Sequence, residues 1–131
     1  MKKIFALVML TIVSITSFAE YCQYTNAITS KDIGGEWEEW EKCKFVFCID
    51  SDNSTITLQK NINEDPFLTL IITDGEKYSN SNGSGYVYYC YNISTMEPAA
   101  IKIRNYEDNN KTQSQVYFYC KDGIILFDIT L

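Results

Sequence analysis

Residues 113–131 read QSQVYFYCKDGIILFDITL, and this stretch decides the fold class of the chain. Apolar and aromatic side chains alternate with others on both sides of Asp122-Gly123, a residue pair typical of a two-residue β-hairpin turn. Because side chains of a strand point alternately to its two faces, each strand of this hairpin has one face suited to a core. In the second strand we expect Phe127, Ile129 and Leu131 in the core, and Asp128 and Thr130 exposed.

The same alternation, interrupted by clusters of Asn, Asp, Ser and Gly, continues through most of the chain. It predicts about seven strands, over residues 43–50, 54–60, 67–73, 86–92, 99–106, 113–121 and 124–131. Residues 20–36 are expected to form an irregular lead-in, residues 74–85 the longest loop, and residues 107–110 a polar hairpin tip. The predicted fold class is all-β: a single small antiparallel meander, closed as a barrel or as a two-sheet sandwich.

The first 19 residues have the three parts of a cleavable secretory signal peptide. Lys2 and Lys3 form a positive n-region, residues 4–15 are mainly apolar, and Ser17-Phe18-Ala19 offers small residues to a signal peptidase. The apolar stretch is shorter than the roughly 20 residues that a membrane-spanning helix needs. We therefore expect a signal-peptide helix over residues 1–19 with cleavage after Ala19, and a single domain over residues 20–131. The expected location is the bacterial periplasm or exterior, without stable membrane insertion after cleavage.

The net charge of residues 20–131 limits the kinds of partner that we expect. Residues 20–131 contain all 17 acidic residues but lack Lys2 and Lys3, so 9 basic residues remain and the net charge is −8. A field of this sign repels the phosphates of nucleic acids and the headgroups of anionic membranes. The sequence therefore predicts no nucleic-acid partner and favours a protein with a basic contact surface.

Five cysteines follow the predicted cleavage point, and an oxidising compartment would allow disulfides between them. Their spacing matches neither a CxxC redox motif nor a zinc-ligand pattern. Since the number is odd, at least one thiol of a monomer stays outside intramolecular bridges. The sequence leaves the pairing open among Cys22, Cys43, Cys48, Cys90 and Cys120.

The chain contains no histidine, and this absence excludes nucleophile–histidine pairs and histidine-ligated zinc. A carboxylate pair or a cysteine near a lysine would remain, but no motif brings such groups together. We therefore predict no catalytic residue, no metal site and no cofactor.

The segment most suggestive of binding is Glu36-Trp37-Glu38-Glu39-Trp40-Glu41, in which four carboxylates surround two tryptophans. Tryptophan is enriched at binding hot spots, so this segment is a candidate surface for a basic partner. The alternative is that both rings plug one end of the barrel, because tryptophan is highly buried on average. A spacing of three residues does not decide between these alternatives.

Gly35-Glu36-Trp37 also resembles the Gly-x-Trp that opens the first strand of lipocalins. That resemblance implies an up-and-down barrel with a ligand cavity, although the last predicted strand lacks the arginine that usually accompanies the motif. We expect a small exported acidic binding protein, similar in class to inhibitors and immunity proteins of the bacterial envelope. The alternatives are a small-ligand-binding β-barrel of the calycin type and an enzyme that uses carboxylates only.

Overall fold

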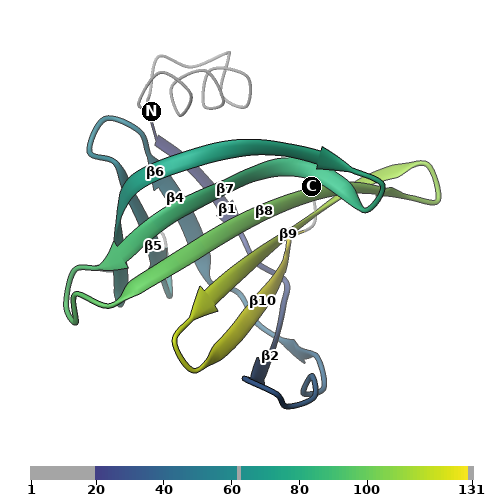
Figure 1. The fold of residues 1–131 in the computed structure, drawn as a ribbon, viewed down its shortest axis with the longest axis horizontal. Helices are drawn as coiled ribbons and strands as arrows, with labels where there is room; N and C mark the ends of the chain where they lie inside the picture. The colour runs from purple at the N-terminus through teal and green to yellow at the C-terminus, as the bar shows by residue number, and fades with distance from the viewer. Residues whose placement is uncertain (1–19, 62, 130–131) are drawn as a thin grey trace.

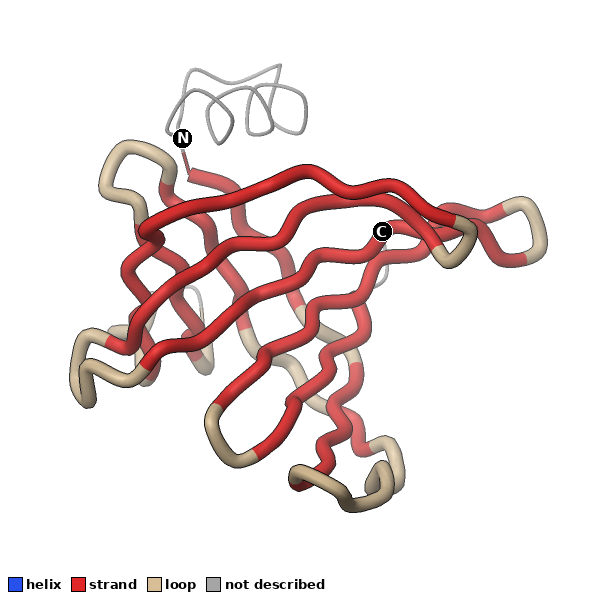
Figure 2. Tube along the Cα trace, in the orientation of Figure 1, coloured by secondary structure: helices blue, strands red, loops and turns tan. Residues whose placement is uncertain are grey.

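The computed structural model describes residues 20–61 and 63–129, and within them it is all-β (Figure 1). Strands and the loops between them account for all of these residues (Figure 2). The predicted signal peptide lies outside the described residues. The ten strands are β1 (Glu20–Tyr24), β2 (Ala27–Asp32), β3 (Glu41–Lys42), β4 (Val46–Asp50), β5 (Thr55–Gln59), β6 (Leu68–Asn80), β7 (Gly83–Asn92), β8 (Pro98–Asp108), β9 (Lys111–Cys120) and β10 (Gly123–Ile129).

All ten strands belong to one antiparallel sheet, in the order β1-β4-β5-β6-β7-β8-β9-β10-β2-β3. From β4 to β10 each strand pairs with the next one along the chain, as a meander requires. The sheet curls into a half-barrel in which β6 to β9 arch over β4 and β5 (Figure 1). The predicted meander is thus confirmed, and it curls as one sheet rather than forming a two-sheet sandwich.

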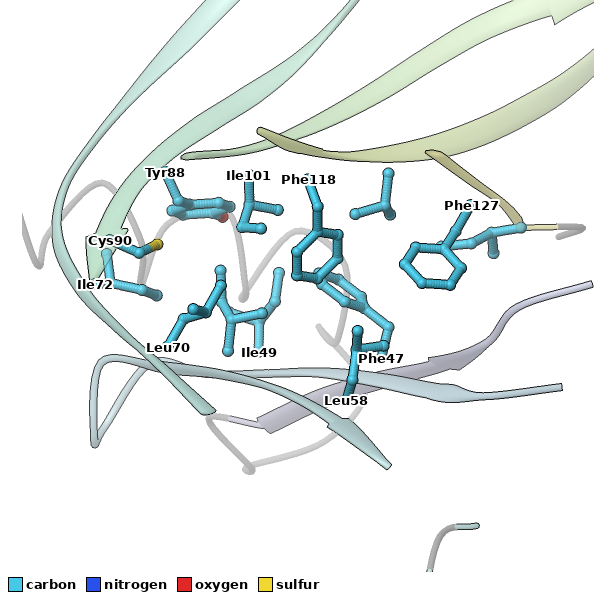
Figure 3. Packing of buried hydrophobic residues seen from close by; sticks show 13 residues of the cluster. Phe47, Ile49, Leu58, Leu70, Ile72, Tyr88, Cys90, Ile101, Phe118 and Phe127 are labelled. Carbon is cyan, nitrogen blue, oxygen red and sulfur yellow. The ribbon is translucent and has the colours of Figure 1, made fainter. Parts of the chain in front are cut away.

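The core lies on the concave side of this sheet, where aromatic and aliphatic side chains from opposite walls meet (Figure 3). The Phe118 ring packs edge-on against Phe47 and Phe127, with centroid separations of 6.3 and 5.6 Å. Such edge-to-face pairs add to the stabilisation that burial of the rings provides. The buried cluster consists of Phe47, Ile49, Ile56, Leu58, Leu70, Ile72, Tyr88, Cys90, Ile101, Val116, Phe118, Phe127 and Ile129.

The predicted irregular lead-in over residues 20–36 is wrong, because β1 and β2 occupy most of it. β1 pairs with β4, while β2 pairs with β10, and Thr25 and Asn26 connect the two. The Asn26 amide donates to the Asp128 carbonyl, so β10 contacts the chain as far as this connection. Polar residues interrupt the apolar alternation in both strands. Their pairing partners, β4 and β10, lie farther along the chain.

The predicted long loop over residues 74–85 is also wrong. β6 continues to Asn80, and β7 begins at Gly83 after a short turn. A register shift between Ile72 and Asp74 and the positive φ angles of Gly83 (141°) and Gly85 (155°) accompany this extension. At Gly85 a β-carbon would collide with the Ile103 carbonyl of β8, so glycine allows the close pairing there.

The other predicted turns fit the structure more closely. The predicted tip over residues 107–110 is shorter in the structure, because Glu107 and Asp108 belong to β8. The turn consists of Asn109 and Asn110, both at positive φ (52° and 64°), as a type I′ turn requires. The β9–β10 turn lies one residue earlier than predicted, because Gly123 already pairs with Cys120.

The core prediction for the last strand is confirmed where the structure describes it. Phe127 and Ile129 are buried, whereas Asp128 is half-buried instead of fully exposed. Thr130 and Leu131 lie outside the described residues.

Candidate functional site

The segment Glu36–Glu41, called here the acidic tryptophan segment, runs beside the edge of β2. The Glu38 amide donates to the Ser30 carbonyl at 2.8 Å, and the Thr29 hydroxyl donates to the Glu38 carbonyl at 2.6 Å. Thr29 is itself buried, with 5 % of its surface exposed. Two bonds to neighbouring β2 residues therefore hold the middle of the segment, although it has no regular structure before β3 begins at Glu41.

Both tryptophans lie at the surface. Trp37 is 42 % exposed and Trp40 is 49 % exposed, and the four glutamates are exposed as well. The Lys31 ammonium lies 5.1 Å from the centroid of the Trp37 ring, which is within cation–π range. The alternative in which the rings plug the end of the barrel is therefore wrong.

A groove of about 650 Å³ lies between the acidic tryptophan segment and β2. Its lining combines the side of β2 with Glu38, Glu39 and Glu41. A carboxylate accepts hydrogen bonds from ammonium and guanidinium groups, and these charge-assisted bonds are stronger than neutral ones. This arrangement can accept basic side chains, and the exposed rings can supply the apolar contact beside them.

The five cysteines separate into one bridge and three thiols. Cys22 and Cys48, which face each other in the β1–β4 ladder, form a disulfide. Cys43 is half-buried, Cys90 is buried, and Cys120 is exposed. Burial raises the pKa of the Cys90 thiol to about 12. Burial also raises the pKa of the Cys120 thiol, and the charges of the carboxylates near it add to this effect.

A second polar cluster, which the sequence reasoning did not single out, lies on the convex side of β8. Lys102, Arg104 and Tyr106 alternate along this strand with the inward-facing Ile101 and Ile103, so they share the outer face. The Lys102 ammonium lies 4.8 Å from the ring centroid of Tyr78 on β6. The Arg104 guanidinium lies 4.2 Å from that of Tyr106. The signal in the sequence was this alternation of cations and a tyrosine on one strand face.

Two features are absent from residues 20–61 and 63–129. No group of three or more cysteine, aspartate or glutamate side chains there could hold a metal ion. No helix in this part of the chain is long and apolar enough to cross a membrane. Comparison of the chain with protein-family models, with curated proteins and with solved structures finds no match.

Proposed function

We propose that this chain is an exported bacterial binding protein that recognises a basic protein through its acidic tryptophan segment. The observation that carries the proposal is the exposure of both Trp37 and Trp40 on a segment with four exposed glutamates. Large exposed rings beside charges that repel unsuitable partners are characteristic of recognition surfaces.

The anchoring of the segment supports the same proposal. A surface that is already held in place loses less conformational entropy on binding than a free loop does. The bonds from Glu38 to Ser30 and from Thr29 to Glu38 supply this restraint through the backbone of the segment. The glutamate side chains that line the groove consequently keep their carboxylates for a partner.

The packing of the concave side favours a surface binder over a carrier with an internal cavity. Phe47, Phe118 and Phe127 meet in the middle of the half-barrel, and each has at most 3 % of its surface exposed (Figure 3). A small barrel of this kind is filled by its own side chains. The chain contains no histidine, which is the side chain that enzymes use most often as a general acid or base.

The partner can be captured from the producing cells with a photo-crosslinking amino acid at position 39. Glu39 is suitable because it is exposed and lies between the two tryptophans. A matched control places the same amino acid at Asp52, an exposed acidic position in the β4–β5 turn. We expect position 39 to yield one prominent protein adduct that position 52 does not, with crosslinked peptides rich in lysine and arginine. Equal adducts from both positions, or an adduct at an acidic surface, would contradict the proposal.

A further inference from the structure

The ends of the β6–β7 and β8–β9 hairpins project side by side beyond the core of the half-barrel (Figure 1). A pocket of about 490 Å³ lies between them. It is lined by residues 79–84 of the first hairpin and by Arg104, Asn105, Tyr106 and Glu107 of the second. Its side chains are mostly amides and hydroxyls, with one guanidinium and one carboxylate.

Arg104 is held in a fixed orientation at this pocket. Its Nε donates to the Asn82 carbonyl at 2.7 Å, and its Nη1 donates to Oε1 of Gln115 at 2.9 Å. The guanidinium carbon lies 4.2 Å from the centroid of the Tyr106 ring. A guanidinium has five N–H donors, so three remain for a ligand. No carboxylate of the described residues forms an ion pair with Arg104.

Gly83 allows the two hairpins to approach closely enough to form this arrangement. A β-carbon there would lie 2.6 Å from the Asn105 carbonyl oxygen and 3.2 Å from Cγ of Arg104. Its φ of 141° is likewise one that residues with a side chain rarely adopt. The turn therefore brings the Asn82 carbonyl to Arg104 without displacing either strand.

The amides around Arg104 are partly committed to the protein and partly available. Asn80 Oδ1 accepts from the backbone N–H of Asn82, and Asn105 Oδ1 accepts from the Ser114 hydroxyl. Asn105 faces the concave side with Ser114, whereas Asn80 and Asn82 lie on the turn beside Arg104. Nδ2 of Asn80 and the side-chain amide of Asn82 make no hydrogen bond to a described residue, so they can bond to a ligand. The carboxylate of Glu107 can accept. Donors and acceptors grouped in this way match the hydroxyl groups of a sugar ring, and the remaining N–H donors of Arg104 match a carboxylate.

We propose that this pocket binds a hexuronate, a sugar ring that bears one carboxylate, with the carboxylate on Arg104 and the hydroxyls on the amides. This site is separate from the acidic tryptophan segment and does not depend on the proposed function. Among the described residues that line the pocket, Arg104 alone is cationic, so the pocket suits a sugar with a single carboxylate. A lysine would offer only a point charge, whereas the fork of Arg104 fits both carboxylate oxygens.

The test is an amide NMR titration of the protein with glucuronate, glucose and acetate in separate series. Glucuronate should shift the amides of residues 79–84 and 104–107, and it should bind at least tenfold more tightly than glucose or acetate. Equal binding of glucose would show that the carboxylate contributes nothing, and equal binding of acetate would show the same for the hydroxyls. Either result, or glucuronate shifts confined to other residues, overturns the proposal.

Arg104→Lys keeps the charge but removes the fork, and we expect it to weaken glucuronate binding about tenfold or more. Lys60→Gln removes an exposed cation elsewhere and should leave the affinity unchanged. If both variants bind as the unmodified protein does, Arg104 does not hold the carboxylate and the proposal fails. The ligand series on the unmodified protein stands even if Arg104→Lys unfolds.

The same chemistry could come from a free sugar acid or from a unit within a polysaccharide. A trimer of linked uronates separates these sources. If the trimer binds more than three times as tightly as the single sugar, the ligand is a segment of a polysaccharide. Equal affinity per unit would identify the single sugar.

Discussion

At the scale of single residues, Phe127 contacts two other aromatic rings in the core. Its ring packs edge-on against Phe118 at 5.6 Å and against Phe45 at 6.2 Å, and only 3 % of the residue is exposed. Phe127→Ala should lower the free energy of unfolding by about 3–5 kcal/mol, because it removes a buried ring and leaves a cavity.

Urea denaturation measures this loss, and Ile124→Ala provides the control. Ile124 lies on the same strand but on the outer face, and it is half-buried. We expect its loss to be clearly smaller than that of Phe127→Ala. A Phe127 loss below about 1 kcal/mol would mean that the register of β10 is displaced by one residue.

The three thiols should react in the order of their exposure. Titration of the native protein should modify Cys120 first and Cys43 more slowly, while Cys90 should react only after unfolding. Because the thiolate is the nucleophile and the pKa of Cys120 is raised, its alkylation rate should still increase above pH 9. Mass spectrometry of alkylated peptides assigns each site. A thiol count other than three after unfolding, or a rate plateau below pH 8, would contradict this assignment.

Some residue positions could be predicted from the sequence and others could not. Alternation correctly placed Phe127 and Ile129 inside, since the period of a strand is independent of what the strand contacts. The exposure of Trp37 and Trp40 could not be derived in this way, because the segment between β2 and β3 has no regular period. It follows instead from the hydrogen bonds of Glu38 to Thr29 and Ser30 of β2, which come together only when the chain folds.

At the scale of elements, all seven predicted strands are present in the described residues, and the structure adds three more. β1 and β2 were missed because polar residues interrupt their apolar pattern and their partners, β4 and β10, lie far along the chain. β3 is only two residues long. The extension of β6 and β7 was missed because glycine usually indicates a loop, whereas here Gly83 and Gly85 permit close strand pairing.

The extended β6–β7 hairpin can be tested with Gly85→Ala. An added β-carbon would collide with the Ile103 carbonyl, and the φ of 155° is unfavourable for alanine. We therefore expect a loss of about 2 kcal/mol or more in the free energy of unfolding.

Gly34→Ala is the matched control for this substitution. Gly34 also has a positive φ (76°), but nothing lies within 4 Å of an added β-carbon there. Its loss should be about 1 kcal/mol, the cost of the backbone conformation alone. Equal losses in denaturant titrations of the two variants would mean that Gly85 lies in a loop and not beside β8.

At the scale of the whole molecule, the proposed export fixes where the mature protein begins. We propose that the exported protein begins at Glu20, after removal of residues 1–19. The Cys22–Cys48 disulfide supports this proposal, since such bonds persist in oxidising compartments. The intact mass of protein recovered from the periplasm or medium should correspond to residues 20–131 with one disulfide. A mass that includes residues 1–19 would contradict cleavage.

The proposed function requires that the acidic tryptophan segment attracts and contacts a basic partner. Its most direct test is the association rate constant with the captured partner, measured as a function of ionic strength. Two double variants change the net charge equally: Glu38→Lys with Glu39→Lys in the segment, and Asp52→Lys with Asp108→Lys at exposed positions elsewhere.

Electrostatic steering predicts that the association rate of the unmodified protein falls steeply as salt screens the charges. It also predicts that the segment variant associates much more slowly than the Asp52 and Asp108 variant at low salt, because the field is strongest at the contact. A rate that is independent of salt, together with an unchanged rate for the segment variant, would contradict the claim.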